Sequence, residues 1–222
     1  MKLSEILFKE ALPLWQEAAE KEFVVEMAKG TLKEKLFRNY MLQDYLYLQD
    51  YNGILSEMLL KTEDSGMAAE ELRAFIKATM QVVEEETYRV HLPNMRGMGI
   101  SEGEIESARR LPAFAEYVAY MRQCLEDEGV LTGLAALLQC SWAYAYIGER
   151  VLSQYAAEVA RSPYKSWFEA YTGPEYLGAN RRWIDFLDAA AEGISGEKVR
   201  HLCGVFTACA RHENRLWDEL YA

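Results

Sequence analysis

Residues 130–148 read VLTGLAALLQCSWAYAYIG and contain no charged side chain. A run this long and apolar meets the length criterion for a membrane span. Its composition favours another interpretation, because Thr132, Gly133 and Gln139 make a poor lipid-facing surface. A helix that is apolar on every side is equally typical of the central buried helix of a large bundle. We therefore expect residues 130–160 to form the core helix of a helical protein.

Segments on both sides of this run carry the signals of further helices. Their apolar residues recur three and four positions apart, and Ser101 with Glu104 forms a capping box at one expected start. No stretch alternates apolar and polar residues over the length of a strand. The sequence therefore predicts an all-α fold, a single-domain helical bundle over residues 1–222. The expected helices cover residues 4–29, broken or kinked at Pro13, and residues 32–62, 68–91, 102–109, 112–127, 130–160, 164–171, 176–192 and 196–221.

The chain is acidic. Among its 222 residues, 35 are Asp or Glu and 24 are Lys or Arg, which gives a formal net charge of −11. An acidic surface repels phosphate backbones and anionic lipids, so we expect neither nucleic acid nor a membrane as a partner. The length corresponds to about one domain.

The cysteines and the N-terminal residues indicate a cytoplasmic protein. The four cysteines form no C-x-x-C pair, and a disulfide scaffold needs denser cysteine in a shorter chain. We therefore expect thiols in a reducing compartment. Charged residues interrupt the first apolar segment, which leaves no signal-peptide core. The cysteines are Cys124, Cys140, Cys203 and Cys209.

Asp44 lies where helical spacing demands an apolar residue. It is the only charge on one face of the expected helix 32–62, and Tyr47 lies at the edge of that face. The face consists of Phe37, Met41, Asp44, Leu48, Tyr51 and Leu55.

Glu213 repeats this pattern in the last expected helix, where it is the only carboxylate on an apolar face. Burying an ionised carboxylate without partners is very costly, so Asp44 and Glu213 must be neutralised, paired or hydrogen-bonded. A structural ion pair or an interhelical hydrogen bond is the ordinary explanation for each. Two such residues in one apolar bundle also fit a shared polar cavity.

Cys140 and Tyr144 face the same way on the central helix, because they lie four residues apart. Tyr117 lies on a similar stripe with Phe114 and Met121. A lone cysteine in a helix is usually a small core residue, and buried tyrosines usually satisfy one hydroxyl. Both the core interpretation and a functional one stay open from spacing alone.

The histidines argue against a metal or haem site. His91, His201 and His212 do not follow a glutamate at the E-x-x-H spacing of di-iron bundles, and no H-E-x-x-H motif occurs. The chain also lacks a Gly-rich phosphate loop and a G-x-S-x-G elbow. We expect no metal and no cofactor, and we assign packing in the core or at the surface to His91 and His201.

Several segments together resemble the thiaminase II (TenA) family. They are FVVEMAKGTL at residues 23–32, QDYLYL at 43–48, CSWAYAYIGE at 140–149, Trp167 with Tyr171, and His212-Glu213 before Trp217. The resemblance extends over essentially the whole chain. It implies a haem-oxygenase-like helical bundle that binds no haem and assembles as a homotetramer.

The resemblance also implies an activity in thiamin salvage. The family deaminates 4-amino-5-aminomethyl-2-methylpyrimidine to the hydroxymethylpyrimidine, or hydrolyses thiamin to the hydroxymethylpyrimidine and a thiazole. By position, Cys140 would be the nucleophile, Glu213 the acid/base, and Asp44 the partner of the exocyclic amine of the pyrimidine. The remaining pocket residues would be Tyr47, Tyr117, Tyr144 and Tyr171.

Two other functions stay open at this point. One is a non-catalytic protein that binds a pyrimidine or a related small ligand. The other is a cofactor-free oxidase of the pyrroloquinoline-quinone-synthase type, which should place basic and histidine side chains around a polyanionic substrate. The expected pocket offers mainly carboxylates and tyrosines, so it favours the hydrolase.

Overall fold

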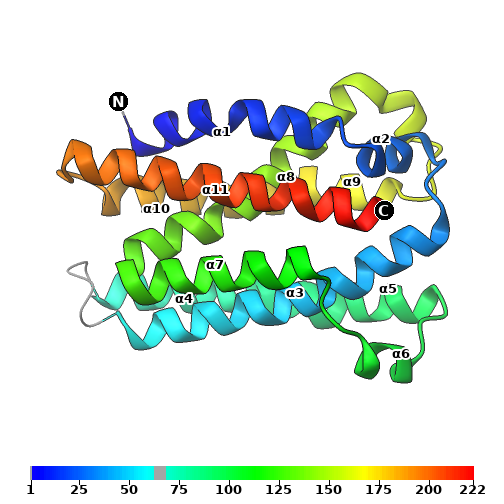
Figure 1. The fold of residues 1–222 in the computed structure, drawn as a ribbon, viewed down its shortest axis with the longest axis horizontal. Helices are drawn as coiled ribbons and strands as arrows, with labels where there is room; N and C mark the ends of the chain where they lie inside the picture. The colour runs from blue at the N-terminus through cyan, green and yellow to red at the C-terminus, as the bar shows by residue number, and fades with distance from the viewer. Residues whose placement is uncertain (1, 63–68) are drawn as a thin grey trace. The chain divides into compact units, whose positions relative to one another are not determined.

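The computed structural model describes residues 2–62 and 69–222, and every regular element in these two ranges is a helix (Figure 1). This confirms the all-α prediction. The elements are α1 (Leu3–Ala19), α2 (Glu22–Lys29), α3 (Glu34–Leu60), α4 (Ala69–Glu85), the π-helix η1 (Glu86–His91), α5 (Leu92–Gly97), α6 (Glu102–Ser107), α7 (Pro112–Glu128), α8 (Val130–Val159), α9 (Lys165–Thr172), α10 (Pro174–Ala190) and α11 (Gly196–Tyr221).

The chain divides into two compact units. The first, called here the α3 unit, is Lys33–Gly133. The second, called the α11 unit, joins the residues up to Leu32 with Leu134–Ala222. The expectation of one domain over residues 1–222 stays a prediction, and the two units are described in turn.

Helix α3 is the centre of its unit, where α4, η1, α5 and α7 all pack against it. Its buried side chains include Tyr40, Met41, Tyr51 and Ile54, which follow the three- and four-residue spacing of one helix face. The expected helix 32–62 therefore differs from α3 only at its ends. The long face of α3 also carries Asp44, and this places a carboxylate inside the core of the unit.

The expected helix 68–91 ends in a widened helical turn. Its first residue, 68, lies outside the described residues. Helix α4 gives way at Glu86 to the π-helix η1, in which the Leu92 N–H donates to the Thr87 carbonyl five residues earlier. Pro93 follows directly in α5 and has no N–H of its own to continue a regular ladder. Neither η1 nor α5 was predicted, because helical periodicity does not distinguish a single π turn.

Helix α1 packs against α11, α2 and α10 within the α11 unit. Trp15 occupies the middle of an aromatic cluster, with ring centroids 5.4 Å from Trp142, 5.7 Å from Phe8 and 5.9 Å from Phe206. The Trp15 side chain is 1% exposed. Burial of aromatic rings on this scale is the main stabilising contribution of such a core.

The first of the two possibilities at Pro13, a break, was wrong, because α1 continues through Pro13 to Ala19. The second possibility, a kink, stays a prediction. A proline removes one hydrogen bond from a helix and bends it, and the surrounding turns can still continue. The break comes at Lys21, whose dihedral angles (φ −60°, ψ 139°) are not helical. Helix α2 then ends at Gly30, which has a left-handed φ of 71°.

Helix α8 is the expected core helix. It is long and apolar enough to cross a membrane by length and composition, yet 78% of its most apolar stretch is buried inside the protein. Tyr155 departs from helical dihedral angles near its C-terminal end (φ −128°, ψ 27°). The burial supports the interpretation of residues 130–160 as a core element.

Candidate functional site

Asp44 is buried on α3 at 4% exposure, and its partner is His91 at the end of η1. His91 Nε2 lies 2.5 Å from Asp44 Oδ2. The Tyr40 hydroxyl donates to the same oxygen over 3.3 Å. No other described residue hydrogen-bonds to Asp44, so Oδ1 keeps both lone pairs available. The requirement that Asp44 be paired is confirmed, and His91 was the residue that the sequence did not identify.

The backbone of η1 fixes the orientation of the His91 ring. His91 Nδ1 lies 3.3 Å from the Glu86 carbonyl oxygen, and because a carbonyl only accepts, Nδ1 must carry a proton. Burial by itself would lower the pKa of His91. The hydrogen bond to Asp44 and the charges of Asp44 and Glu86 outweigh that effect and raise the pKa to about 8. At neutral pH His91 is therefore an imidazolium.

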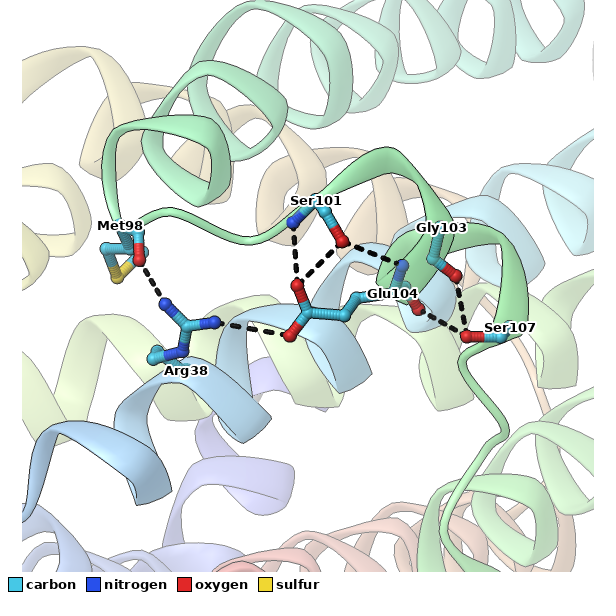
Figure 2. A network of polar contacts seen from close by, with 6 residues as sticks. All are labelled: Arg38, Met98, Ser101, Gly103, Glu104 and Ser107. Carbon is cyan, nitrogen blue, oxygen red and sulfur yellow. Dashed lines mark hydrogen bonds and ion pairs between the residues drawn. The ribbon is translucent and has the colours of Figure 1, made fainter.

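Further contacts from α3 hold the segment between α5 and α7. Gln43 donates through Nε2 to the Arg109 carbonyl (2.9 Å) and accepts through Oε1 from the Leu111 N–H (2.8 Å). Figure 2 shows that Arg38 holds the other end of the segment, where its guanidinium donates to the Met98 carbonyl and to the Glu104 carboxylate. These bonds fix the backbone beside Asp44 on both sides of α6.

Glu104 belongs to the capping box predicted at Ser101. The Glu104 carboxylate accepts from the Ser101 N–H and hydroxyl, both at 2.8 Å, while the Glu104 N–H donates to the Ser101 Oγ (Figure 2). These hydrogen bonds lower the pKa of Glu104, and Arg38 adds to the effect. The cap therefore supplies the anion to which Arg38 is bound.

Tyr47 and Tyr117 stack on each other within the α3 unit. Their ring centroids are 5.9 Å apart with an interplanar angle of 26°, and Phe114 meets the Tyr47 ring edge-on at 6.4 Å. The Tyr47 hydroxyl donates to the Met121 sulfur over 3.8 Å. The structure therefore brings these two predicted residues together, and both are buried.

Cys140 lies half-buried on α8, one helical turn before Tyr144. The ring of Tyr144 lies 4.8 Å from that of Tyr171, on α9, in an edge-on contact. Trp167 closes this aromatic group at 4.7 Å from Tyr171 and 5.7 Å from Tyr144. Of the predicted residues, Tyr144 and Tyr171 are thus in direct ring contact, and the half-exposed thiol of Cys140 lies on the same side of α8.

The residue after Cys140 is bound firmly to α10. The Ser141 carbonyl accepts from the Tyr176 hydroxyl (3.1 Å) and from Asn180 Nδ2 (3.2 Å), and the Ser141 hydroxyl donates to Asn180 Oδ1 (2.8 Å). Asn180 is 6% exposed. This network fixes the helical turn that carries Cys140, and no periodicity in the sequence pointed to it.

Glu213 is 1% exposed on α11, and Trp217 follows it one turn later. The Trp217 ring lies 5.7 Å from Tyr144 and 5.5 Å from Phe23. Trp217 therefore connects the helix of Glu213 with the aromatic group beside Cys140. The prediction that Glu213 faces the protein interior is confirmed by its burial.

The predicted site residues thus form two groups, one in each unit. Asp44, Tyr47 and Tyr117 belong to the α3 unit; Cys140, Tyr144, Tyr171 and Glu213 belong to the α11 unit. All four cysteines, which lie within the described ranges, are thiols as expected. Among residues 2–62 and 69–222, no group of three His, Cys, Asp or Glu side chains could hold a metal ion.

A family model described as the TENA/THI-4/PQQC family matches residues 8–222. The chain belongs to this family. An aminopyrimidine aminohydrolase of Halalkalibacterium halodurans is 28% identical over 221 residues, which cover 100% of this chain and 96% of that protein.

Solved structures show the same fold. A protein titled a TenA family transcription regulator from Silicibacter sp. TM1040 has a TM-score of 0.87 at 22% identity and covers 99% of this chain and 96% of its own. A Shewanella denitrificans domain with a haem-oxygenase-like fold has a TM-score of 0.77 at 16% identity and covers 100% of this chain and 92% of its own. The haem-oxygenase-like architecture of this TENA/THI-4/PQQC chain agrees with the expected fold.

Proposed function

We propose that this protein is an aminopyrimidine hydrolase of thiamin salvage. The observation that carries the proposal is the full-length match to an aminopyrimidine aminohydrolase, in a family whose model spans residues 8–222. The preferred reaction is deamination of 4-amino-5-aminomethyl-2-methylpyrimidine, with thiamin hydrolysis as the related activity. The buried Asp44, with Oδ1 open to a donor, is chemically suited to an aromatic amine.

The chemistry assigns one role to each reactive group. The Cys140 thiolate adds to a ring carbon of the pyrimidine, and Glu213 gives a proton to the ring nitrogen that gains the electron pair. The bond from the exocyclic methylene to its protonated amino group then breaks, and ammonia leaves. Water adds its hydroxyl to the methylene and releases its other proton to the solvent, the ring proton returns to Glu213, and the thiolate is expelled. The net reaction consumes one water and releases one ammonia.

The surroundings support these roles. A carboxyl at 1% exposure is suited to hold and return a proton, because burial disfavours its charged form. Tyr144 and Tyr171 offer aromatic faces beside the thiol, and Tyr47 and Tyr117 offer them on the helix of Asp44. As part of the proposal, Asp44, Cys140 and Glu213 all act in this reaction.

The assay follows ammonia and hydroxymethylpyrimidine after the aminomethylpyrimidine is added to the purified protein. Cys140→Ser should lower kcat at least about a hundredfold, since a hydroxyl is a far weaker nucleophile than a thiolate. Cys203→Ser is the matched control, because Cys203 is a half-buried thiol on α11 outside the proposed site. Wild-type turnover by Cys140→Ser would contradict the nucleophile role. Binding without release of ammonia by the wild type would favour the non-catalytic binder instead.

The remaining parts of the proposal concern place and assembly. We place the enzyme in the cytoplasm, in agreement with its four thiols. We further propose a homotetramer, because four large apolar side chains of the α3 unit are exposed and would gain by being covered. They are Leu60, Val82, Tyr88 and Val90. Size-exclusion chromatography with light scattering tests the tetramer.

A further inference from the structure

The mechanism above leaves the buried His91 without a role. His91 is 5% exposed and lies within 2.5 Å of the carboxylate that is proposed to bind the substrate amine. It is the last residue of η1. A histidine in this position can influence a ligand through Asp44.

The positions of the protons follow from the two contacts of the ring. The Glu86 carbonyl requires a proton on Nδ1, so a second proton of the pair can lie only between Nε2 and Asp44 Oδ2. That proton belongs to the imidazolium or, if transferred, to Oδ2. In both cases Oδ1 carries none.

We propose that His91 is a positioning residue that keeps Asp44 Oδ1 free of protons, so that this oxygen accepts from an amino group and rejects an acceptor in its place. The inference rests on the proposed function, because it specifies how the site distinguishes a 4-aminopyrimidine from a pyrimidine with an oxygen at the same carbon. A histidine that served only packing would have no effect on this preference.

Removing His91 would change the chemistry of the carboxylate. A buried carboxylate that loses its cationic partner is neutralised by a proton, because an uncompensated charge is costly in the core. With leucine at position 91, the new proton can occupy Oδ1. With glutamine, the amide donates to Oδ2, and the proton is directed to Oδ1. Asp44 would then be able to donate to an oxygen or a ring nitrogen.

The test measures binding of two ligands by calorimetry. One is 4-amino-5-hydroxymethyl-2-methylpyrimidine; the other is its 4-methoxy analogue, which has an oxygen at that carbon and no ring N–H. The wild type should prefer the amino ligand by about tenfold or more, since an acceptor facing an acceptor leaves buried groups unsatisfied. In His91→Leu and His91→Gln this ratio should fall at least about fivefold. The steric effect of the methoxy group is the same in all variants and cancels from the comparison.

Tyr40→Phe is the matched control. It removes the other hydrogen bond to Oδ2 and leaves His91 in place, so the ratio should stay within about threefold of the wild type. Unchanged ratios in both His91 variants would overturn the inference. A loss in Tyr40→Phe as large as in His91→Gln would overturn it too, because general disturbance of α3 would then explain both.

A measurement on the wild type alone guards against variants that fail to fold. Nitrogen-15 NMR of the histidine rings should show a protonated Nδ1 for His91 at neutral pH, and an unprotonated Nδ1 would overturn the assignment. The two levels of failure are distinguishable. If the wild type binds neither ligand, the proposed function is refuted. If the wild type and all variants prefer the amino ligand to the same extent, only the role of His91 is refuted.

Discussion

Replacing the buried pair by two amides, Asp44→Asn together with His91→Gln, should change how the stability of the protein depends on pH. The folded protein raises the pKa of His91 from 6.5 to about 8, so folding binds a proton that the unfolded chain releases more easily. The contribution is fully present below pH 6.5 and is lost as the pH rises through 8. Since each unit of pKa corresponds to about 1.4 kcal/mol, the rise is equivalent to about 2 kcal/mol.

The assay is urea unfolding followed by circular dichroism at pH 6 and pH 9, at one protein concentration. The free energy of unfolding of the wild type should fall by about 2 kcal/mol more between these pH values than that of the double variant. The double variant has no titrating group at position 44 or 91, and all other titrating groups are shared, so their effects cancel from the difference. His201→Gln, at an exposed position of α11, serves as the control and should behave as the wild type. An identical pH response of the wild type and the double variant would refute the ion pair of His91 with Asp44.

Three further predictions concern stability and can be measured by the same unfolding experiment at pH 7. Trp15→Ala should cost about 3–5 kcal/mol, because it empties the middle of the aromatic cluster of α1. Gly148→Ala should cost about 1–3 kcal/mol, since its Cβ would lie 2.7 Å from Thr172 Cγ2, and Thr172 is held by a hydrogen bond to the Phe168 carbonyl. Gly204→Ala has no neighbour within 4 Å and should instead stabilise α11 by about 0.5–1 kcal/mol.

Apolar spacing was sufficient to predict the long helices, because their buried faces repeat over many turns. Helix α11 begins and ends where the sequence places it, and the Ser195 hydroxyl caps it by accepting from the Lys198 N–H. Short-range irregularities were not predictable in this way. The sequence has neither proline nor glycine at Lys21, where the helix breaks, whereas Pro13 lies inside a continuous helix.

In the candidate site, too, spacing identified some residues and missed others. Asp44 and Glu213 were identifiable because each is a carboxylate on an otherwise apolar face, and both are buried. Their partners were not identifiable from spacing. His91 is 47 residues from Asp44 in the chain, and only the fold brings them together. Asn180, which holds the turn after Cys140, is 39 residues from Ser141.

The extra residue in the wide turn of η1 changes the direction in which the side chains of the following helix, α5, point. An α-helix turns about 100° per residue, so Val83 and Met95, twelve positions apart, would point about 120° away from each other in a regular helix. One residue taken up by a wider turn reduces that angle to about 20°, which accounts for the burial of both side chains. Deleting a single residue between 86 and 91 would therefore rotate α5 out of the core.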